Sequence, residues 1–266
     1  WLLAGWSATG PVFGVQLGTQ PFEGQERLSP VLTTGHELVT DSGGPGEFRG
    51  GMGVEKGGTL YACERTVVSY CCDRERSVTW GLWGGLPSIP HGVWVNPGED
   101  NERYLGSLFS GVTLDQGDTV TRPSAGGGGL GDPLKRDVYS VLDDVEQGYV
   151  SIERAEKDYG VVIKELDADL YKYEIDQKET DSTREYISEK RISWLQEDPS
   201  VIAERYRKKE LNKFDLLRRY AVIVDWGSGV LLENTTKEFR AMFNRRSVPY
   251  WHSTNVIPNT NTRHSS

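Results

Sequence analysis

The sequence predicts an α+β protein, with an antiparallel β body rich in glycine and tryptophan and a mainly helical C-terminal extension that contains a small β-hairpin. Of the 31 glycines, 27 lie in residues 1–131. Residues 132–220 carry 22 acidic and 17 basic side chains among 89 positions, which is typical of helices with wide solvated faces. These contrasts divide the chain into a β-rich core over 1–131, a helical end of that core over 132–163, a charged helical extension with the hairpin over 164–252, and a flexible tail over 253–266.

The β body is predicted from short runs of β-branched and aromatic residues that alternate with turn residues. Such runs, bounded by glycine, proline and polar residues, are the usual signal of short antiparallel strands. We expect strands at Val31–Thr33, Thr66–Cys72, Val93–Val95 and Thr119–Thr121.

The first helices are predicted from apolar spacing and capping residues. Asp137–Gln147 places apolar side chains at i, i+3, i+4 and i+7, and Gly148 follows it as a left-handed cap. Ser151 is placed to cap a second helix, which Gly160 ends. The first helix therefore has a stop signal, and the second has both a start and a stop signal.

Further helices and a hairpin are expected in the extension. Ser182 and Glu185 have the spacing of a capping box, in which hydroxyl and carboxylate satisfy free amides at a helix start. Thr236 is placed to cap the last helix. The predicted helices are Thr183–Leu195, Val201–Lys209, Leu211–Arg219 and Lys237–Asn244, and the predicted hairpin pairs Ala221–Val224 with Val230–Leu232 around a glycine-containing loop.

Composition excludes several classes of protein. The net charge of −9 and the pI of about 5.1 argue against general nucleic-acid binding, which needs a basic face. The apolar runs are far shorter than a membrane-spanning helix. Three cysteines, without any C-x-x-C pair, and four scattered histidines argue against a disulfide framework or a metal site in this chain. We expect a cytoplasmic protein, and the absence of Met before Trp1 suggests that leading residues are missing.

The first candidate site is the glycine run before Asp132. Glycine lets backbone amides converge on an anion, which makes Gly126, Gly127, Gly128 and Gly129 candidates for binding substrate or phosphate. The run matches neither the phosphate-binding loop, which needs G-x-x-x-x-G-K-[ST], nor the dinucleotide fingerprint. A tightly packed structural turn is therefore favoured over a ligand contact.

The second candidate site mixes charge with glycine between Asp41 and Gly51. Asp41 and Arg49 could hold a carboxylate or phosphate, although an ion pair that bridges a glycine loop uses the same residue types and is the favoured interpretation. Arg74, which precedes the Trp- and Gly-rich segment 80–87, poses the same choice. Asp41, Arg49 and Arg74 are our candidates for catalytic residues, with Arg49 as an anion clamp.

Five segments in order resemble the hydantoinase B family, which includes subunits of N-methylhydantoinases and acetone-type carboxylases and the matching half of 5-oxoprolinases. The segments are Asp41–Gly51, Gly81–Pro87, Gly126–Asp137, Asp143–Ser151 and Asp158–Val162. The resemblance covers residues 20 to 163 and corresponds to the C-terminal portion of the family's subunits. It implies that the N-terminal portion, where the family places much of its chemistry and its metal site, lies on another chain.

The extension past Val162 resembles the ketone-carboxylase branch of the family, and the divided organisation resembles an acetophenone carboxylase-type enzyme. The resemblance implies a subunit of an ATP-dependent carboxylase that joins bicarbonate to a ketone through an enol phosphate and carboxyphosphate. The implied partners are a hydantoinase A-like subunit that holds ATP and a truncated hydantoinase B-like subunit. ATP and a divalent metal are expected on those partners, and none on this chain alone.

Two alternatives stay open. The chain could be a component of an ATP-dependent hydantoinase or 5-oxoprolinase, which opens a cyclic amide and needs no bicarbonate. It could also be a structural interaction module without any residue in an active site. Exposed apolar surface in the isolated chain would favour this module, because an assembly surface leaves such patches when its partners are removed.

Overall fold

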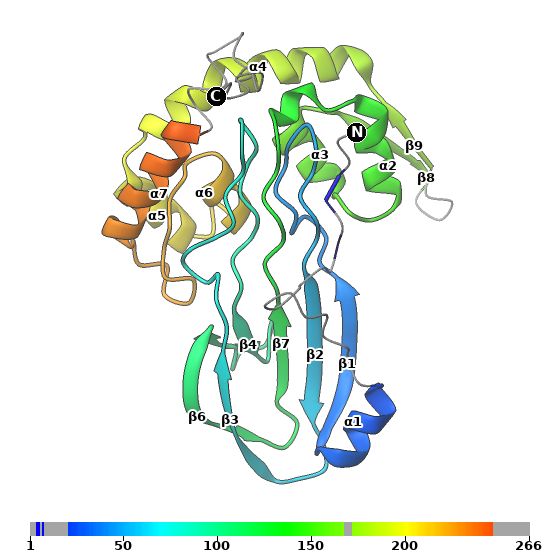
Figure 1. Cartoon of the computed structure of the whole chain (residues 1–266), viewed down its shortest axis with the longest axis vertical. Helices are drawn as coiled ribbons and strands as arrows, with labels where there is room; N and C mark the ends of the chain where they lie inside the picture. The colour runs from blue at the N-terminus through cyan, green and yellow to red at the C-terminus, as the bar shows by residue number, and fades with distance from the viewer. Residues whose placement is uncertain (1–3, 6, 8–20, 168–171, 247–266) are drawn as a thin grey trace, which may run out of the picture.

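The computed structural model describes residues 4, 5, 7, 21–167 and 172–246 of the 266-residue chain. It confirms the predicted α+β class, because antiparallel sheets lie in the N-terminal half and helices dominate the C-terminal part (Figure 1). The N-terminal sheets and the first short helix lie at one end of the elongated molecule, and the other helices and a small β-hairpin lie at the other end (Figure 1). The predicted tail over 253–266 lies outside the described residues.

Two antiparallel sheets form the β body. The larger sheet has the strand order β1-β2-β7-β4-β5, and β3 and β6 form a separate two-stranded sheet. The short helix α1, Phe22–Leu28, precedes the first strand. The strands are β1 Val31–Leu38, β2 Val54–Leu60, β3 Arg65–Cys71, β4 Val93–Val95, β5 Arg103–Gly106, β6 Leu108–Asp115 and β7 Thr119–Pro123.

In the β body, the structure places a strand at each of the four predicted positions and adds three strands that were not predicted. The missed strands are β2, β5 and β6. Gly57 and Gly58 interrupt β2, so its local composition indicates a turn. Pairing on both sides nevertheless holds β2 extended, since β1 and β7 both bond to it.

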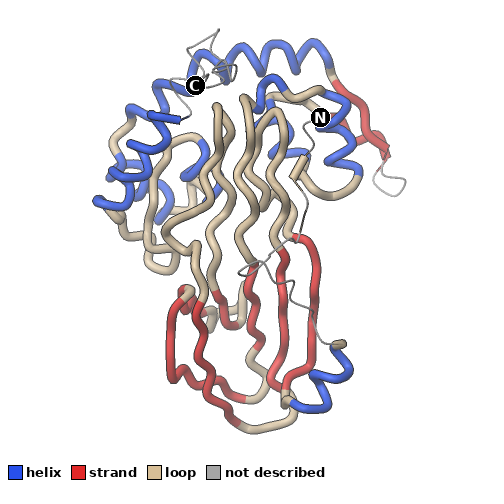
Figure 2. The backbone as a smooth tube through the Cα atoms, viewed as in Figure 1, coloured by secondary structure: helices blue, strands red, loops and turns tan. Residues whose placement is uncertain are grey.

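A layer of glycine-rich backbone connects the sheets to the helices. Residues 41–53, 79–92 and 124–131 run as extended segments that are mostly not regular strands (Figure 2). They bond to one another directly: the amide of Gly44 donates to Gly127 at 2.8 Å, and that of Leu86 donates to Pro45 at 2.7 Å. A Cβ atom on Gly129 would lie 1.9 Å from the Pro45 carbonyl oxygen. The segments therefore approach more closely than residues with side chains permit.

Local signals predicted the first two helices accurately. Helix α2, Val138–Glu146, has Asp137 as its N-cap, and Gly148 follows it with φ of 73°. Helix α3, Ile152–Tyr159, starts with the Ser151 hydroxyl accepting from the Arg154 amide, and Gly160 ends it with φ of 65°. A 3₁₀ turn, η1 Pro133–Lys135, precedes both helices.

The start of the extension differs from the prediction. A small hairpin of β8, Ile163–Asp167, and β9, Lys172–Ile175, follows α3. Helix α4 spans Gln177–Gln196 and begins at the Asp176 cap, which accepts from the Glu179 amide at 3.1 Å. The predicted capping box at Ser182 is wrong, because Ser182 lies inside α4 and its hydroxyl donates to the Lys178 carbonyl.

The later helices match the prediction in order, with shifted ends. Helix α5 spans Pro199–Arg207, α6 spans Lys213–Arg218 and α7 spans Glu233–Arg246. The segment predicted as a hairpin at 221–232 forms a single antiparallel bridge between Val224 and Leu231. Thr236 is not a helix cap: it lies inside α7, and its buried hydroxyl bonds the backbone amide and carbonyl of Ile223.

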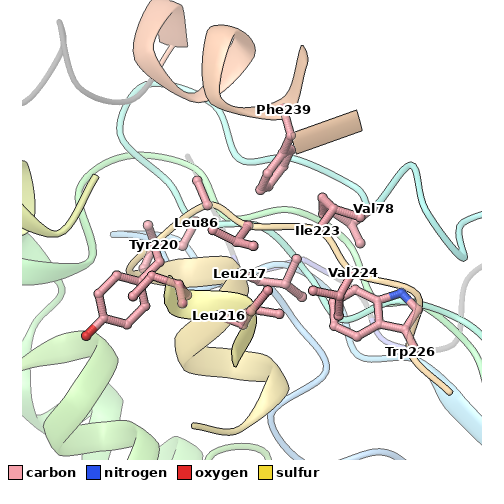
Figure 3. Packing of buried hydrophobic residues seen from close by; sticks show 13 residues of the cluster. Val78, Leu86, Leu216, Leu217, Tyr220, Ile223, Val224, Trp226 and Phe239 are labelled. Atoms are coloured by element: carbon pink, nitrogen blue, oxygen red, sulfur yellow. The ribbon is translucent and has the colours of Figure 1, made fainter. Parts of the chain in front are cut away.

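The main hydrophobic cluster joins the extension to the β-rich core. Val78, directly before the second segment of the glycine-rich layer, and Leu86, within that segment, pack with the extension's apolar side chains (Figure 3). Their buried partners include Leu216, Leu217, Tyr220, Ile223, Val224, Trp226 and Phe239. Arg218 adds a polar connection, because its guanidinium donates to the carbonyls of Asp41, Gly43 and Pro87.

Among the described residues, no helix is long and apolar enough to cross a bilayer.

Candidate functional site

Arg49 and part of the glycine run line the same cavity. The cavity has a volume of about 490 Å³ and lies on the glycine-rich layer. Its lining consists of Gly5, Phe48, Arg49, Gly50, Gly51, Met52, Ala125, Gly126, Gly127, Gly128 and Leu130. Two of the segments singled out in the sequence therefore meet here, although they are more than 70 residues apart. Gly129 does not line the cavity and packs against Pro45 instead.

The Arg49 side chain is buried and held from three directions. Its Nε donates to Asp144 Oδ1 at 3.2 Å, and its Nη1 donates to the Gly50 carbonyl at 2.9 Å. The guanidinium carbon lies 5.0 Å from the centre of the Tyr149 ring. These contacts fix the orientation of the guanidinium, because a planar group with directed N–H donors has little freedom once three partners engage it.

Asp144 is shared between two arginines. Its Oδ2 accepts from Arg136 Nη2 at 2.8 Å, and both arginine side chains are at least nine-tenths buried. Arg136 also donates to the Glu47 carbonyl at 2.9 Å. Two guanidinium groups and one carboxylate carry a net charge of +1. This buried cluster therefore favours negative charge in its neighbourhood, in a region where solvent screening is weak.

The glycines of the wall pack closely against neighbouring backbone. A Cβ atom on Gly50 would lie 2.1 Å from the Gly127 carbonyl oxygen, and one on Gly126 would lie 2.4 Å from that of Ser42. The Gly127 amide donates to the Gly51 carbonyl at 2.8 Å. Close packing and cavity lining thus coexist at these positions, which the sequence analysis treated as alternatives.

Asp41 lies away from this cavity and holds loops together. Its Oδ1 accepts from the Ser151 amide at 2.8 Å, and its own amide donates to Tyr149 at 3.0 Å. Its φ of 64° is left-handed, a region where Asp is tolerated better than most residues. Burial raises the pKa of Asp41 above its ordinary value. Asp41 and Arg49 do not pair with each other. The ion pair of Arg49 is formed with Asp144 instead.

Arg74 is also outside the cavity. Its side chain is exposed, with Nη1 donating to the Ser77 carbonyl at 3.3 Å, and its backbone carbonyl accepts from the His91 amide. Its φ of 71° is left-handed. Neighbouring Arg76 lies 3.8 Å from Asp225.

Within the described residues, no group of three or more His, Cys, Asp or Glu side chains could hold a metal ion.

Sequence reasoning missed the residues that complete the Arg49 cluster. Arg136, Asp144 and Tyr149 lie in segments that carried the family resemblance, but none was assigned a role. One signal in the sequence could have found Asp144, because this charged residue lies on the apolar face of the helix predicted over Asp137–Gln147. Asp144 falls three residues after Val141, on the face that α2 buries, and a buried carboxylate requires a partner.

The β-rich core resembles a hydantoinase B-type segment. Residues 3–133 match the family described as hydantoinase B/oxoprolinase. The match confirms the family predicted from the ordered motifs.

Particular relatives come from more than one branch of that family. The chain is 37% identical over 166 residues to the beta chain of the caprolactamase of Pseudomonas jessenii, covering 60% of this chain and 28% of the relative. It is 26% identical over 220 residues to the alpha chain of the acetone carboxylase of Xanthobacter autotrophicus, covering 71% and 27%. It is also 28% identical to a putative D-/L-hydantoinase component of a Pseudomonas species, covering 62% and 26%. The chain thus spans about a quarter of the length of these relatives.

Two solved structures have a similar fold. A nucleotide-free acetone carboxylase structure aligns with 99% of this chain and 38% of its own, with a TM-score of 0.62 and 20% identity. The ATP-dependent caprolactamase of Pseudomonas jessenii aligns with 62% of this chain and 28% of its own, with a TM-score of 0.52 and 31% identity.

Proposed function

We propose that this chain supplies a hydantoinase B-type segment to a multisubunit, ATP-dependent enzyme that carboxylates a ketone with bicarbonate. ATP and a divalent metal are held by partner subunits in this proposal, namely a hydantoinase A-like subunit and a second hydantoinase B-like subunit. This chain completes the hydantoinase B-like half. Because the reaction consumes ATP, we expect it in the cytoplasm.

The proposal rests on how much of this chain each solved structure aligns with. The likeness to acetone carboxylase covers 99% of this chain, whereas the likeness to caprolactamase covers 62%. The described extension is fixed to the β-rich core, because it shares a buried cluster with Val78 and Leu86. An extension that is built into the core and has a counterpart in the carboxylase fold favours the carboxylase branch.

The cavity at Arg49 suits a supporting role in such a reaction. Phosphorylated intermediates carry negative charge and are lost to water, so an enclosing surface with a buried net positive charge would protect them. The Arg49, Asp144 and Arg136 cluster supplies that charge behind a wall of glycine backbone. In this role Arg49 is an anion clamp whose guanidinium is oriented by Asp144.

A second function is favoured by sequence identity. The caprolactamase beta chain is 37% identical over 60% of this chain. If that likeness extends to activity, the complex would use ATP to open a cyclic amide and would not need bicarbonate. The cavity and its charge cluster would then face a different phosphorylated intermediate.

One experiment separates the two functions. The complex is purified from its native source, its subunits are identified by mass spectrometry, and substrate-dependent ATP hydrolysis is measured with and without bicarbonate. The carboxylase proposal expects hydrolysis that requires both a ketone and bicarbonate. Hydrolysis that responds to a cyclic amide and ignores bicarbonate would replace it with the second function.

Arg49 is tested in the same complex with Arg49→Met, and Arg65→Gln serves as the matched control. Arg65 is an exposed arginine whose partner, Asp115, lies on the neighbouring strand. We expect Arg49→Met to lower turnover in an intact complex, and Arg65→Gln to leave it unchanged. Unchanged turnover by an assembled Arg49→Met complex would exclude the clamp.

A further inference from the structure

A second cavity lies between the two sheets of the β body. Its volume is about 290 Å³, and none of its lining residues lines the cavity at Arg49. The strands of the larger sheet form one wall, and β3 and β6 form the other. Most of its side chains are apolar, including Val31, Leu60, Val68, Val93, Leu105, Phe109, Leu114 and Val120.

Three basic side chains form a row across adjacent strands at this cavity. His36 on β1 pairs in register with Lys56 on β2, and Lys56 pairs with Arg122 on β7. Residues directly opposite each other on paired strands project from the same face of the sheet. Lys56 and Arg122 line the cavity, whereas His36 does not; its ring lies 5.3 Å from that of Phe22, which does line it.

The row lacks a compensating anion. Within the described part of the chain, no carboxylate forms an ion pair with Lys56 or Arg122, although the protein carries a net charge of −9. Arg122 instead lies over the Tyr70 ring, with its guanidinium carbon 5.6 Å from the ring centre. Burial and the neighbouring Arg122 charge lower the pKa of Lys56. The two cations repel each other, and a bound anion would relieve that repulsion.

At the opposite end of the cavity, the carboxylate of the lining already has hydrogen-bond partners within the protein. Asp118, directly before β7, is the acidic residue of the lining. Its oxygens accept from Asn96 Nδ2 at 2.7 Å and from Arg103 Nη2 at 3.4 Å. The cavity is therefore polarised along β7, from a pair of cations through an apolar middle to a neutralised carboxylate.

We propose that this cavity binds a small amphipathic carboxylate, with its head group on Lys56 and Arg122 and its hydrocarbon between the sheets. Arginine and lysine are the usual partners of a carboxylate, and the arginine can engage both oxygens. The apolar walls favour a hydrocarbon body over a second charge. The volume is close to the lower limit of about 300 Å³ for ligand pockets, so the body is short. This binding function goes beyond the proposed enzymatic role and does not depend on it.

The test measures binding of octanoate to the full chain by titration calorimetry, with 1-octanol and inorganic phosphate as comparison ligands. We expect saturable binding of octanoate that is at least about tenfold tighter than that of either comparison ligand, because each lacks one half of the recognition. Equal binding of 1-octanol, or phosphate binding without any gain from the hydrocarbon, would overturn the proposal, as would the absence of octanoate binding.

Variants then locate the site. Lys56→Gln and Arg122→Gln are expected to weaken octanoate binding by about tenfold or more each. Arg65→Gln on β3 removes an exposed cation as the matched control and should leave binding unchanged. Val68→Phe fills the cavity and is expected to abolish octanoate binding while the two cations remain. Thermal unfolding checks that each variant is folded, and octanoate binding that survives in folded Lys56→Gln, Arg122→Gln and Val68→Phe variants would refute the assignment.

Discussion

At the scale of single residues, the buried charges around Arg49 depend on one shared carboxylate. Asp144 accepts from both Arg49 and Arg136, and all three side chains are at least nine-tenths buried. Burying a charge is unfavourable unless a partner of opposite charge and hydrogen bonds compensate for it. Removing the carboxylate therefore affects two cations, whereas removing Arg49 leaves the Arg136 pair intact.

We predict that Asp144→Asn destabilises the protein more than Arg49→Met does. Asp144→Asn leaves two buried guanidinium groups without an anion and should cost about 3–5 kcal/mol. Arg49→Met keeps the Arg136 to Asp144 pair at 2.8 Å and should cost about 1–3 kcal/mol. Urea unfolding of both variants gives the comparison. A larger loss for Arg49→Met would mean that the two arginines do not depend on this carboxylate equally.

Asp41 provides a prediction about pH. Burial raises its pKa above the ordinary 3.8, so the folded protein binds this proton more tightly than the unfolded chain. The contribution of Asp41 to stability is therefore greatest below pH 3.8 and falls as the pH rises through the pKa of the folded state. Asp41→Asn keeps an acceptor for the Ser151 amide and tolerates the left-handed φ, but it does not titrate.

We therefore expect Asp41→Asn to be at least as stable as the natural protein at pH 7, with the difference shrinking as the pH falls towards 3.8. Asp41→Gly keeps the φ but loses the acceptor, and it should be less stable than Asp41→Asn at every pH. Unfolding midpoints of the three proteins across this range test the linkage. A stability difference that grows on acidification would show that the sign is wrong.

At the scale of elements, local signals predicted α2 and α3 but missed the Asp176 cap at the start of α4. The α2 and α3 boundaries follow from Asp137, Gly148, Ser151 and Gly160, because each of these caps acts within a few residues of its helix. Strand β2 could not be predicted in this way, since two neighbouring strands stabilise it from distant parts of the chain.

The candidate site shows the same division between local and distant information. Glycine and Arg49 were identified because their clustering in the sequence is unusual. The pairing of Arg49 with Asp144 spans 95 residues, and no local pattern encodes it. Asp41 and Arg74 satisfied the same residue-type criteria as Arg49, yet the fold places both outside the Arg49 cavity. Residue type identified these three positions as candidates, but it did not show which of them lines the cavity.

The glycine-rich layer is an element in its own right, and its tolerance for side chains can be tested with a matched pair. In Gly50→Ala the new Cβ would lie 2.1 Å from the Gly127 carbonyl oxygen, so the layer must separate. Gly24→Ala meets no atom within 4 Å and lies in α1, where alanine is the better helix former by roughly 0.5–1 kcal/mol. We expect Gly50→Ala to lower the unfolding temperature strongly and Gly24→Ala to hold or raise it. Equal effects would mean that the layer is not closely packed.

At the scale of the whole molecule, the β-rich core and the extension form one connected body. Val78 and Leu86 share a buried cluster with side chains from α5, α6 and α7, and Arg218 on α6 reaches the carbonyls of Asp41 and Gly43. The cavity at Arg49 belongs to this body, and glycine backbone forms much of its lining. The chain spans about a quarter of its relatives, so the proposed assembly would bring further protein to this molecule.

The last prediction concerns this cavity in the assembled enzyme. If the Arg49 cavity encloses an intermediate together with a partner, amides in residues 48–52 and 125–128 should exchange hydrogen more slowly in the complex than in the isolated chain. Helix α5, Pro199–Arg207, provides the internal reference, because it lies in the extension and lines no part of this cavity. Hydrogen exchange followed by mass spectrometry measures both regions in one sample. Slower exchange at the two glycine segments with little change in α5 would support an enclosed site. Unchanged exchange at those segments, in a complex that hydrolyses ATP, would contradict the proposal that a partner encloses the cavity.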